Sequence, residues 1–248
     1  MPNKKTAKGT EYRPHMNIQY SPDADPLQKL DVYVPGGTAP TAGRPLVVYV
    51  HGGAFKMGDK ADPGPSLDYA LKALDYGFVM ASVNYRLTGS EQVEPEIEDV
   101  WAALRWLSAN AESYKYRINR EKIAFLGASA GAGLASVVAA RANKGDGPSV
   151  KAVVGISGAY HITKTAEELH PGAPPFYIAH GTKDSALDLS VSEDFCAALK
   201  AAGVPYEFAI AEGADHCRAD DKPHIYQVLE ETGKLDDAWV WLRKIFEG

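Results

Sequence analysis

The sequence predicts an α/β fold in which helices cover both faces of a mostly parallel sheet. Short apolar runs, such as residues 46–50 (LVVYV), alternate along the chain with segments of helical periodicity, such as residues 95–114. The first of these runs is continuously apolar rather than alternating in polarity, as expected for a strand that is buried on both faces.

The beginning of the chain is expected to add antiparallel strands at one edge of this sheet. Residues 1–11 are predicted to be a flexible tail, because chain ends are usually disordered unless they are tied down. Residues 12–20 and 29–34 have strand character, and the turn residues between them predict a hairpin. A Gly/Pro-rich loop follows at residues 35–45.

Strands and helices then alternate to the end of the chain. Further strands are expected at residues 46–50, 78–84, 123–126, 150–156, 176–179 and 206–210. Helices are expected at residues 66–76, 95–114, 130–142, 189–202 and 224–246, the last of them broken near Gly233. No linker divides the pattern, so residues 12–248 are predicted to form a single domain.

Composition excludes several classes of function. The chain has 248 residues, 45% of them hydrophobic, and a net charge of −6, which does not suit nucleic-acid binding. The sequence shows neither a signal-peptide core nor an apolar run long enough for a membrane span, so a soluble cytoplasmic protein is expected. Its two cysteines, Cys196 and Cys217, do not make a disulfide framework. The seven histidines show no zinc-ligand spacing, so no metal is expected.

A tight turn between a strand and a helix is predicted at Gly127-Ala128-Ser129-Ala130-Gly131. This G-x-S-x-G pattern is typical of a nucleophile elbow, in which the glycines avoid crowding and the serine hydroxyl is exposed at the carboxyl end of the sheet. Ser129 is therefore the candidate nucleophile. The alternative is that the glycines only let the helix pack closely on the sheet.

A second glycine-containing loop, His51-Gly52-Gly53-Ala54-Phe55, directly follows the strand at residues 46–50. A developing oxyanion needs pre-aimed donors, each worth about 3 kcal/mol, and glycines let a backbone turn its N–H groups inward. We expect these donors to be the N–H groups of Gly53, Ala54 and Ala130. Gly52 remains an alternative because the register of the loop can differ by one residue. His51 is expected to brace the loop.

The candidate acid and base follow later strands. Asp184 ends the segment HGTKD after the strand at residues 176–179, where it would accept the Nδ1–H of a histidine. Asp188 is the competing acid, although a role at the start of a helix explains it more simply. His216 ends the segment AEGADH after the last strand, in a Gly-containing loop suited to presenting it to Ser129. His180 is expected at a strand end, beside the acid.

The segments HGGAF, GASAG, HGTKD and GADH, in this order, resemble the motifs of the α/β-hydrolase carboxylesterases. The resemblance is to the esterase/lipase branch with hormone-sensitive-lipase-like and acetyl- or feruloyl-esterase-like enzymes, and NYRL (residues 84–87) and LKAAGVP (residues 199–205) share it. It covers residues 29–248 and implies an eight-stranded α/β-hydrolase fold and an acyl-enzyme mechanism without a cofactor. It also implies catalytic roles for Ser129, Asp184 and His216.

Two departures from that family pattern bear on the pocket. Ala54 replaces the third glycine of the usual HGGG, and the loop between Ile156 and Phe176 is too short for a large helical lid. We therefore expect a small or absent lid and an open, shallow site for short acyl chains or for esters of bulky groups such as sugars. The residues expected to line it, because they follow strand ends on the same rim, are Phe55, Lys56, Tyr85, Tyr160 and His161.

The predicted function is the hydrolysis of short-chain carboxylic esters, including acetyl or feruloyl esters of sugars or aryl alcohols. The expected partner is a small-molecule ester, and a homodimer is left open. One alternative is an amidase or formamidase, although kynurenine-formamidase-like enzymes usually follow HGG with an aromatic pair rather than Ala54-Phe55. The other is a non-catalytic binding protein, although such proteins have usually lost a triad member.

Overall fold

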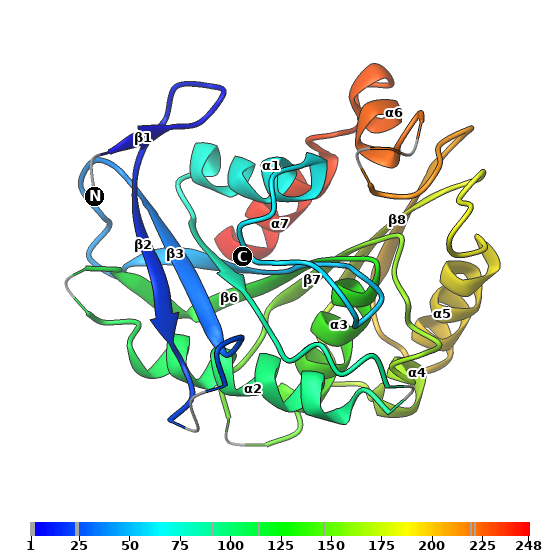
Figure 1. Ribbon diagram of the computed structural model, residues 1–248, viewed down its shortest axis with the longest axis horizontal. Coiled ribbons are helices and arrows are strands. Elements are labelled where there is room, and N and C mark those ends of the chain that lie inside the picture. The colour runs from blue at the N-terminus through cyan, green and yellow to red at the C-terminus, as the bar shows by residue number, and fades with distance from the viewer. Residues whose placement is uncertain are drawn as a thin grey trace.

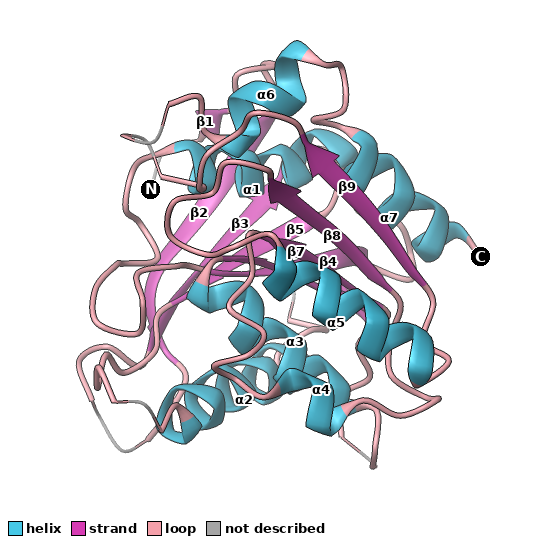
Figure 2. Cartoon of the chain, turned by 90° about the vertical axis from the view of Figure 1, so that its right-hand side faces the viewer, coloured by secondary structure: helices cyan, strands magenta, loops and turns pink. Residues whose placement is uncertain are grey.

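The protein is described by a computed structural model that covers residues 3–22, 25–90, 92–113, 115–145, 147–218, 220 and 222–248. Within these residues, nine strands form one sheet in the order β1-β2-β3-β5-β4-β6-β7-β8-β9. Helices cover both faces of the sheet, as Figures 1 and 2 show. The predicted α/β architecture is therefore confirmed.

The first three strands and β5 form the antiparallel part of the sheet. The predicted hairpin is present as β2 (Glu11–Gln19) and β3 (Lys29–Pro35), which pair antiparallel. β3 then pairs antiparallel with β5 (Val79–Val83). β1 (Lys4–Lys5) pairs with the start of β2, so the segment expected to be a tail adds a two-residue strand to the eight that were expected.

The remaining pairs of neighbouring strands are parallel. They join β4 (Arg44–Val50) to β5 and to β6 (Ile118–Ala128), and then β7 (Ala152–Ile156), β8 (Phe176–Gly181) and β9 (Tyr206–Ala211) in order. β6 begins at Ile118 rather than at Ile123, because its polar first half continues the pairing beyond the buried core. All carboxyl ends of these parallel strands meet at one edge, where the site lies.

Two layers of helices pack on the sheet. One face carries α2 (Glu94–Ala109), α3 (Ala130–Ala142), α4 (Thr165–Glu168) and α5 (Ser190–Ala201). The other carries α1 (Pro65–Leu71), the 3₁₀ helix η1 (Lys72–Tyr76), α6 (Ile225–Glu231) and α7 (Asp237–Glu247). Val47 and Val48 of β4 belong to opposite cores, as the two-residue repeat of a strand requires.

Several helices begin or end at residues that differ from those the apolar pattern predicted. The helix expected over residues 66–76 is divided into α1 and η1, and Gly77 ends it with a positive φ of 78°. The helix expected over residues 95–114 ends at Ala109, and its expected last residue, Tyr114, lies outside the described residues. α3 has the predicted bounds, and the last predicted helix is divided near Gly233 as expected.

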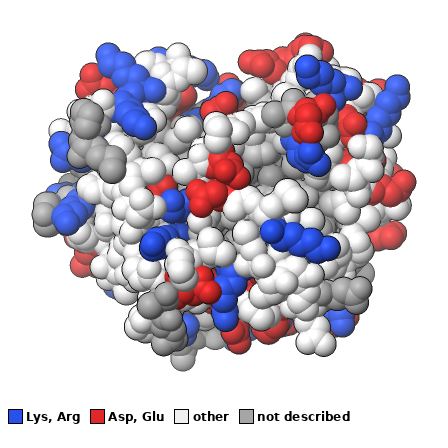
Figure 3. All heavy atoms as spheres, viewed as in Figure 1, with Lys and Arg blue, Asp and Glu red and all other residues white. Residues whose placement is uncertain are grey.

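Acidic and basic side chains are intermingled over the face of the molecule seen in Figure 3. None of the helices in the described ranges combines the length and the hydropathy that a membrane crossing would need. In the same ranges, no group of three His, Cys, Asp or Glu side chains is arranged to hold a metal ion.

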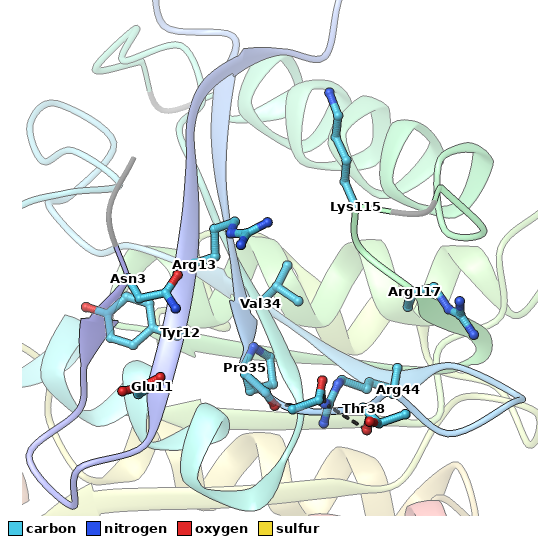
Figure 4. Close-up of a pocket in the computed structure, with 13 residues that line it drawn as sticks. Asn3, Glu11, Tyr12, Arg13, Val34, Pro35, Thr38, Arg44, Lys115 and Arg117 are labelled. Atoms are coloured by element: carbon cyan, nitrogen blue, oxygen red, sulfur yellow. Dashed lines mark hydrogen bonds between the residues drawn. The ribbon is translucent and has the colours of Figure 1, made fainter.

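A hollow of about 370 Å³ lies beside the amino end of β4, at the opposite end of that strand from His51 (Figure 4). Arg44 is 9% exposed and donates to the carbonyl oxygens of Gly36, Thr38 and Gly77 at 3.0, 3.2 and 3.3 Å. These bonds fix the Gly/Pro-rich loop and satisfy the guanidinium. Lys115 points away from Arg44 in Figure 4, so the basic side chains around this hollow do not converge.

A buried ion pair fastens the loop that follows β4. Lys60 Nζ lies 3.2 Å from Asp31 Oδ2 of β3, and the two side chains are 6% and 0% exposed. The main chain of Lys60 also donates to Asn84 Oδ1 and accepts from Ser82 Oγ. The loop is thereby tied to two neighbouring strands, which fixes its path over the carboxyl edge of the sheet.

We expect Lys60→Ala to lower the free energy of unfolding by about 3–5 kcal/mol, because it leaves the carboxylate of Asp31 buried without its partner. Urea denaturation followed by tryptophan fluorescence measures this loss. Lys8→Ala is the matched control, since its pair with Asp236 is exposed and should contribute less than about 1 kcal/mol. Equal small losses in both variants would contradict an anchoring role for Lys60.

Candidate active site

Ser129 lies at the turn between β6 and α3 in a backbone conformation that is rare for a residue with a side chain. Its φ is 54° and its ψ is −122°. Its N–H donates to Ile156 O of β7 at 2.9 Å, and its carbonyl accepts from Ala132 N at 3.0 Å. Bonds to a strand and to a helix thus hold the strained turn.

The glycines of this turn are required by close packing. A Cβ at position 131 would lie 2.1 Å from Val50 O, and one at position 127 would lie 2.4 Å from Ala132 Cα. The close helix packing that was the alternative explanation of these glycines is therefore present, and it is also what forms the turn. The hydroxyl of Ser129 is left facing a cleft.

The structure brings the three candidate residues Ser129, His216 and Asp184 together in a continuous chain of hydrogen bonds. Ser129 Oγ lies 3.0 Å from His216 Nε2, and His216 Nδ1 lies 2.7 Å from Asp184 Oδ2. Because a carboxylate only accepts, Nδ1 carries the hydrogen and Nε2 is free to accept the serine proton. The side chains of His216 and Asp184 are 3% and 0% exposed, so water hardly competes for these bonds.

The loops after β8 and β9 are cross-tied, which fixes the distance between Asp184 and His216. Asp215 Oδ1 accepts from Ser185 N at 2.8 Å and from His216 N at 2.7 Å. This role of Asp215 was not predicted from the sequence, although the residue stands directly before the candidate histidine. At position 181 a Cβ would lie 2.3 Å from Ala214 O, so only glycine lets the two loops approach this closely.

Asp184 has a second histidine neighbour that sequence analysis placed beside the acid without giving it a role. His180 Nε2 lies 3.2 Å from Asp184 Oδ2, and its Nδ1 lies 2.7 Å from Ser192 Oγ. Asp188, the competing acid, is exposed and accepts from Ser190 N near the start of α5. The helix-start explanation therefore fits Asp188.

Burial and hydrogen bonding act in opposite directions on the buried pair. Burial would raise the pKa of Asp184, but hydrogen bonds from His180 and His216 lower it well below the usual range for aspartate. Burial would lower the pKa of His216, but its contacts with Asp184 and Cys217 raise it above the usual value for histidine. The result is an ionised carboxylate beside an imidazole that accepts a proton readily.

The loop after β4 passes directly beside Ser129. A Cβ on Gly52 would lie 3.0 Å from Ser129 Cβ, and the next residues, Gly53 and Ala54, have positive φ values of 116° and 53°. Outside helices and strands, no main-chain hydrogen bond between described residues uses the N–H of Gly53 or Ala54. Ala130 is the first residue of α3, where an N–H has no partner within the helix. All three expected donors are therefore available.

His51 supports this loop by stacking and hydrogen bonding. Its ring stacks on Tyr85 with 4.5 Å between ring centroids, and its Nδ1 lies 2.7 Å from Gly52 O. The Tyr85 hydroxyl donates to His51 O at 2.9 Å. Burial lowers the pKa of His51, which keeps the imidazole neutral under the loop.

Ser129 and His216 lie in a cleft of about 470 Å³ whose other lining residues come mainly from the segment 49–67, together with Cys217, Arg218 and Asp220. Met57 is 65% exposed and contributes an apolar wall, while Asp59 and Arg218 contribute charge. The connection from β7 to β8 contains only the four-residue α4 as a helix, in line with the expected small lid.

None of the five residues expected to line the pocket lines this cleft. Phe55, Tyr85 and Tyr160 are 4%, 0% and 2% exposed, because their aromatic rings turn back into the protein after the strand ends. The ring of Tyr160, for example, stacks on Phe195 of α5 with centroids 4.1 Å apart. Lys56 and His161 are exposed to solvent.

Comparison with known proteins identifies a family to which the sequence is similar. Residues 30–169 match the family model described as BD-FAE. Esterase LipC of Mycobacterium tuberculosis is 29% identical in an alignment that covers 71% of this chain and 53% of the relative. The probable isoprenylcysteine alpha-carbonyl methylesterase ICME of Oryza sativa subsp. japonica is 25% identical, in an alignment that covers 77% of this chain and 55% of that relative. The chain thus spans about half the length of these curated relatives.

Solved structures share the architecture. A truncated carbohydrate esterase from gut microbiota has a TM-score of 0.80 at 18% identity, covering 99% of this chain and 100% of that one. A thermophilic esterase from Thermogutta terrifontis, solved with propionate bound, has a TM-score of 0.73 at 21% identity and covers 95% and 94%. At these identities the likeness establishes the common fold.

We expect Gly131→Ala to lower the free energy of unfolding by about 1–3 kcal/mol or more, because its methyl group would collide with Val50 O. Thermal and urea denaturation measure the change. Gly145→Ala is the control, since a Cβ there meets nothing within 4 Å. If both substitutions were equally harmless, the close contact between α3 and β4 would not be a rigid feature of the fold.

Proposed function

Because the chain belongs to the BD-FAE family, we propose that it is a serine carboxylesterase with Ser129 as nucleophile, His216 as general base and Asp184 as the supporting acid. The observation that carries the proposal is the hydrogen-bond chain of 3.0 and 2.7 Å that joins the three side chains. Two of its relatives are named as esterases, which supports ester hydrolysis as the reaction.

Acylation follows from this geometry. His216 Nε2 takes the proton of Ser129 as Oγ forms a bond to the ester carbonyl carbon. The N–H groups of Gly53, Ala54 and Ala130 receive the oxyanion, and Asp184 stabilises the imidazolium. His216 then gives the proton to the leaving alcohol as the C–O bond breaks, which leaves an acyl-enzyme on Ser129.

Deacylation repeats these steps with water. His216 takes a proton from a water molecule, whose oxygen attacks the acyl carbon. The same donors hold the second oxyanion, and the returning proton restores the Ser129 hydroxyl as the carboxylic acid departs. Neither half of the reaction requires a cofactor.

The cleft supports a preference for short acyl chains or for bulky alcohols such as sugars. The connection from β7 to β8 carries only α4 as a helix and contributes no lining residue to the cleft, which combines apolar Met57 with polar groups such as Asp59 and Arg218. An open and mixed surface suits a small acyl group with a large, hydrated leaving group better than a long alkyl chain that must be shielded from water.

We expect p-nitrophenyl acetate and butyrate to be hydrolysed faster than decanoate, and Ser129→Ala to lower kcat by about 10⁴–10⁶. Ser149→Ala, at the opposite end of the sheet before β7, is the matched control and should retain activity. Wild-type inactivity on every ester would contradict the proposal. Preference for decanoate would contradict the short-chain part, and turnover of N-formylkynurenine alone would favour the formamidase alternative.

The pH dependence of kcat/KM should reflect the protonation of His216. Only neutral His216 can act as a base, so kcat/KM should fall as the pH drops through its pKa. The raised pKa places this acidic limb above the ordinary value of about 6.5. Asp184→Asn should move the limb to lower pH and reduce kcat by about 10⁴, because it removes the charge that stabilises the imidazolium. An unmoved limb in this variant would exclude Asp184 as the partner of His216.

A further inference from the structure

The carboxylate of Asp184 is shared by two buried histidines. His180, near the end of β8, places Nε2 3.2 Å from Oδ2, the same oxygen that accepts from His216 at 2.7 Å. The other oxygen, Oδ1, accepts from the main-chain N–H groups of Ala186 and Leu187 at 3.0 and 2.8 Å. Three donors therefore hydrogen-bond to this carboxylate at 2.7–3.0 Å, and His180 Nε2 lies beside it at the longer distance of 3.2 Å.

The partners of His180 determine where its hydrogen lies. Nε2 donates to Leu187 O at 2.9 Å and also lies 3.2 Å from Asp184 Oδ2, so it carries the hydrogen and shares it between these two acceptors. Nδ1 lies 2.7 Å from Ser192 Oγ, whose hydroxyl can donate to it. His180 and Ser192 are both 0% exposed. The imidazole is thus fully satisfied in its neutral form, and α5 fixes its orientation through Ser192.

Other titratable groups surround the pair without taking this position. Asp215, on the loop that carries His216, accepts from Ser185 N and His216 N. Cys217 contacts His216 from the same loop. Asp188 is exposed beside α5 and accepts from Ser190 N. In the described part of the chain, the two histidines are the residues whose side-chain nitrogens lie within 3.2 Å of Asp184 Oδ2.

We propose that His180 is a positioning residue for the ester hydrolysis proposed above: as the second donor to Oδ2 it holds the carboxylate of Asp184 in place and disperses its charge, which sets the pH at which His216 can act as a base. This inference rests on the proposed function. A carboxylate with one fewer donor stabilises a neighbouring imidazolium more strongly. Loss of His180 therefore leaves His216 protonated up to a higher pH.

The test compares His180→Leu, which removes the donor, with His180→Gln, which keeps an amide N–H that can reach Asp184. The readouts are the pH profile of kcat/KM and a proton NMR titration of the His216 ring. In His180→Leu the acidic limb should rise by about 0.5–1 pH unit, the shift that corresponds to one hydrogen bond. KM should stay unchanged because His180 does not line the cleft, and His180→Gln should restore the wild-type limb.

Two further variants keep the test decisive. His170→Leu removes a histidine bonded to Ala140 O near the far end of α3, and should leave the limb unmoved. Ser192→Ala removes only the hydroxyl that orients His180, and should raise the limb by less, even if His180→Leu does not fold.

The outcomes separate this inference from the proposed function. If His180→Leu lowers the melting temperature but leaves the acidic limb of the pH profile unchanged, His180 contributes only packing. That result would overturn the inference without contradicting the proposed esterase activity. Conversely, the NMR titration of His216 does not require turnover. A shift of that titration in a protein that hydrolyses no ester would overturn the proposed function, and would leave the contact between His180 and the Asp184–His216 pair established.

Discussion

The contact between the first turn of α3 and the end of β4 is the constraint on which the rest of the site depends. Val50 O lies where a side chain at position 131 would have to be, so only glycine allows the helix to start there. This approach forces Ser129 into its strained conformation. Because the loop beginning at His51 leaves β4 at the same point, one contact brings the candidate nucleophile and the N–H donors together.

Around that contact, polar groups hold the loops by hydrogen bonds and an ion pair between elements. His51 and Tyr85 support the donor loop, and Lys60 fastens its far end to Asp31. On the other side of the cleft, Asp215 joins the loops that carry Asp184 and His216. Each of these polar groups has a partner on another strand or loop, so several elements together hold the loops around the site.

Sequence patterns predicted the parts of this arrangement that follow from strand ends and glycines. Parallel strands bring their carboxyl ends to one edge, so Ser129, Asp184 and His216 could be located from the apolar runs before them. The pocket lining could not be, because a loop has no periodicity to show whether an aromatic ring such as Tyr85 or Tyr160 turns outward or back into the core. The roles of His180 and Asp215 could not be predicted either, because they depend on contacts between loops. The strand that contains Lys4 was missed because it forms by pairing with a neighbouring strand at Tyr12.

The wide spacing of the site along the chain has a consequence for folding. Ser129 and His216 are separated by 87 positions, and the candidate acid by 32 from the base. Their side chains can meet only after β6, β7, β8 and β9 have paired in parallel, and such non-local pairing is slow because the entropy of closing long loops is lost before the contacts form. The hydrogen-bond chain therefore requires β9 to be paired, and no fragment that ends before β9 contains it.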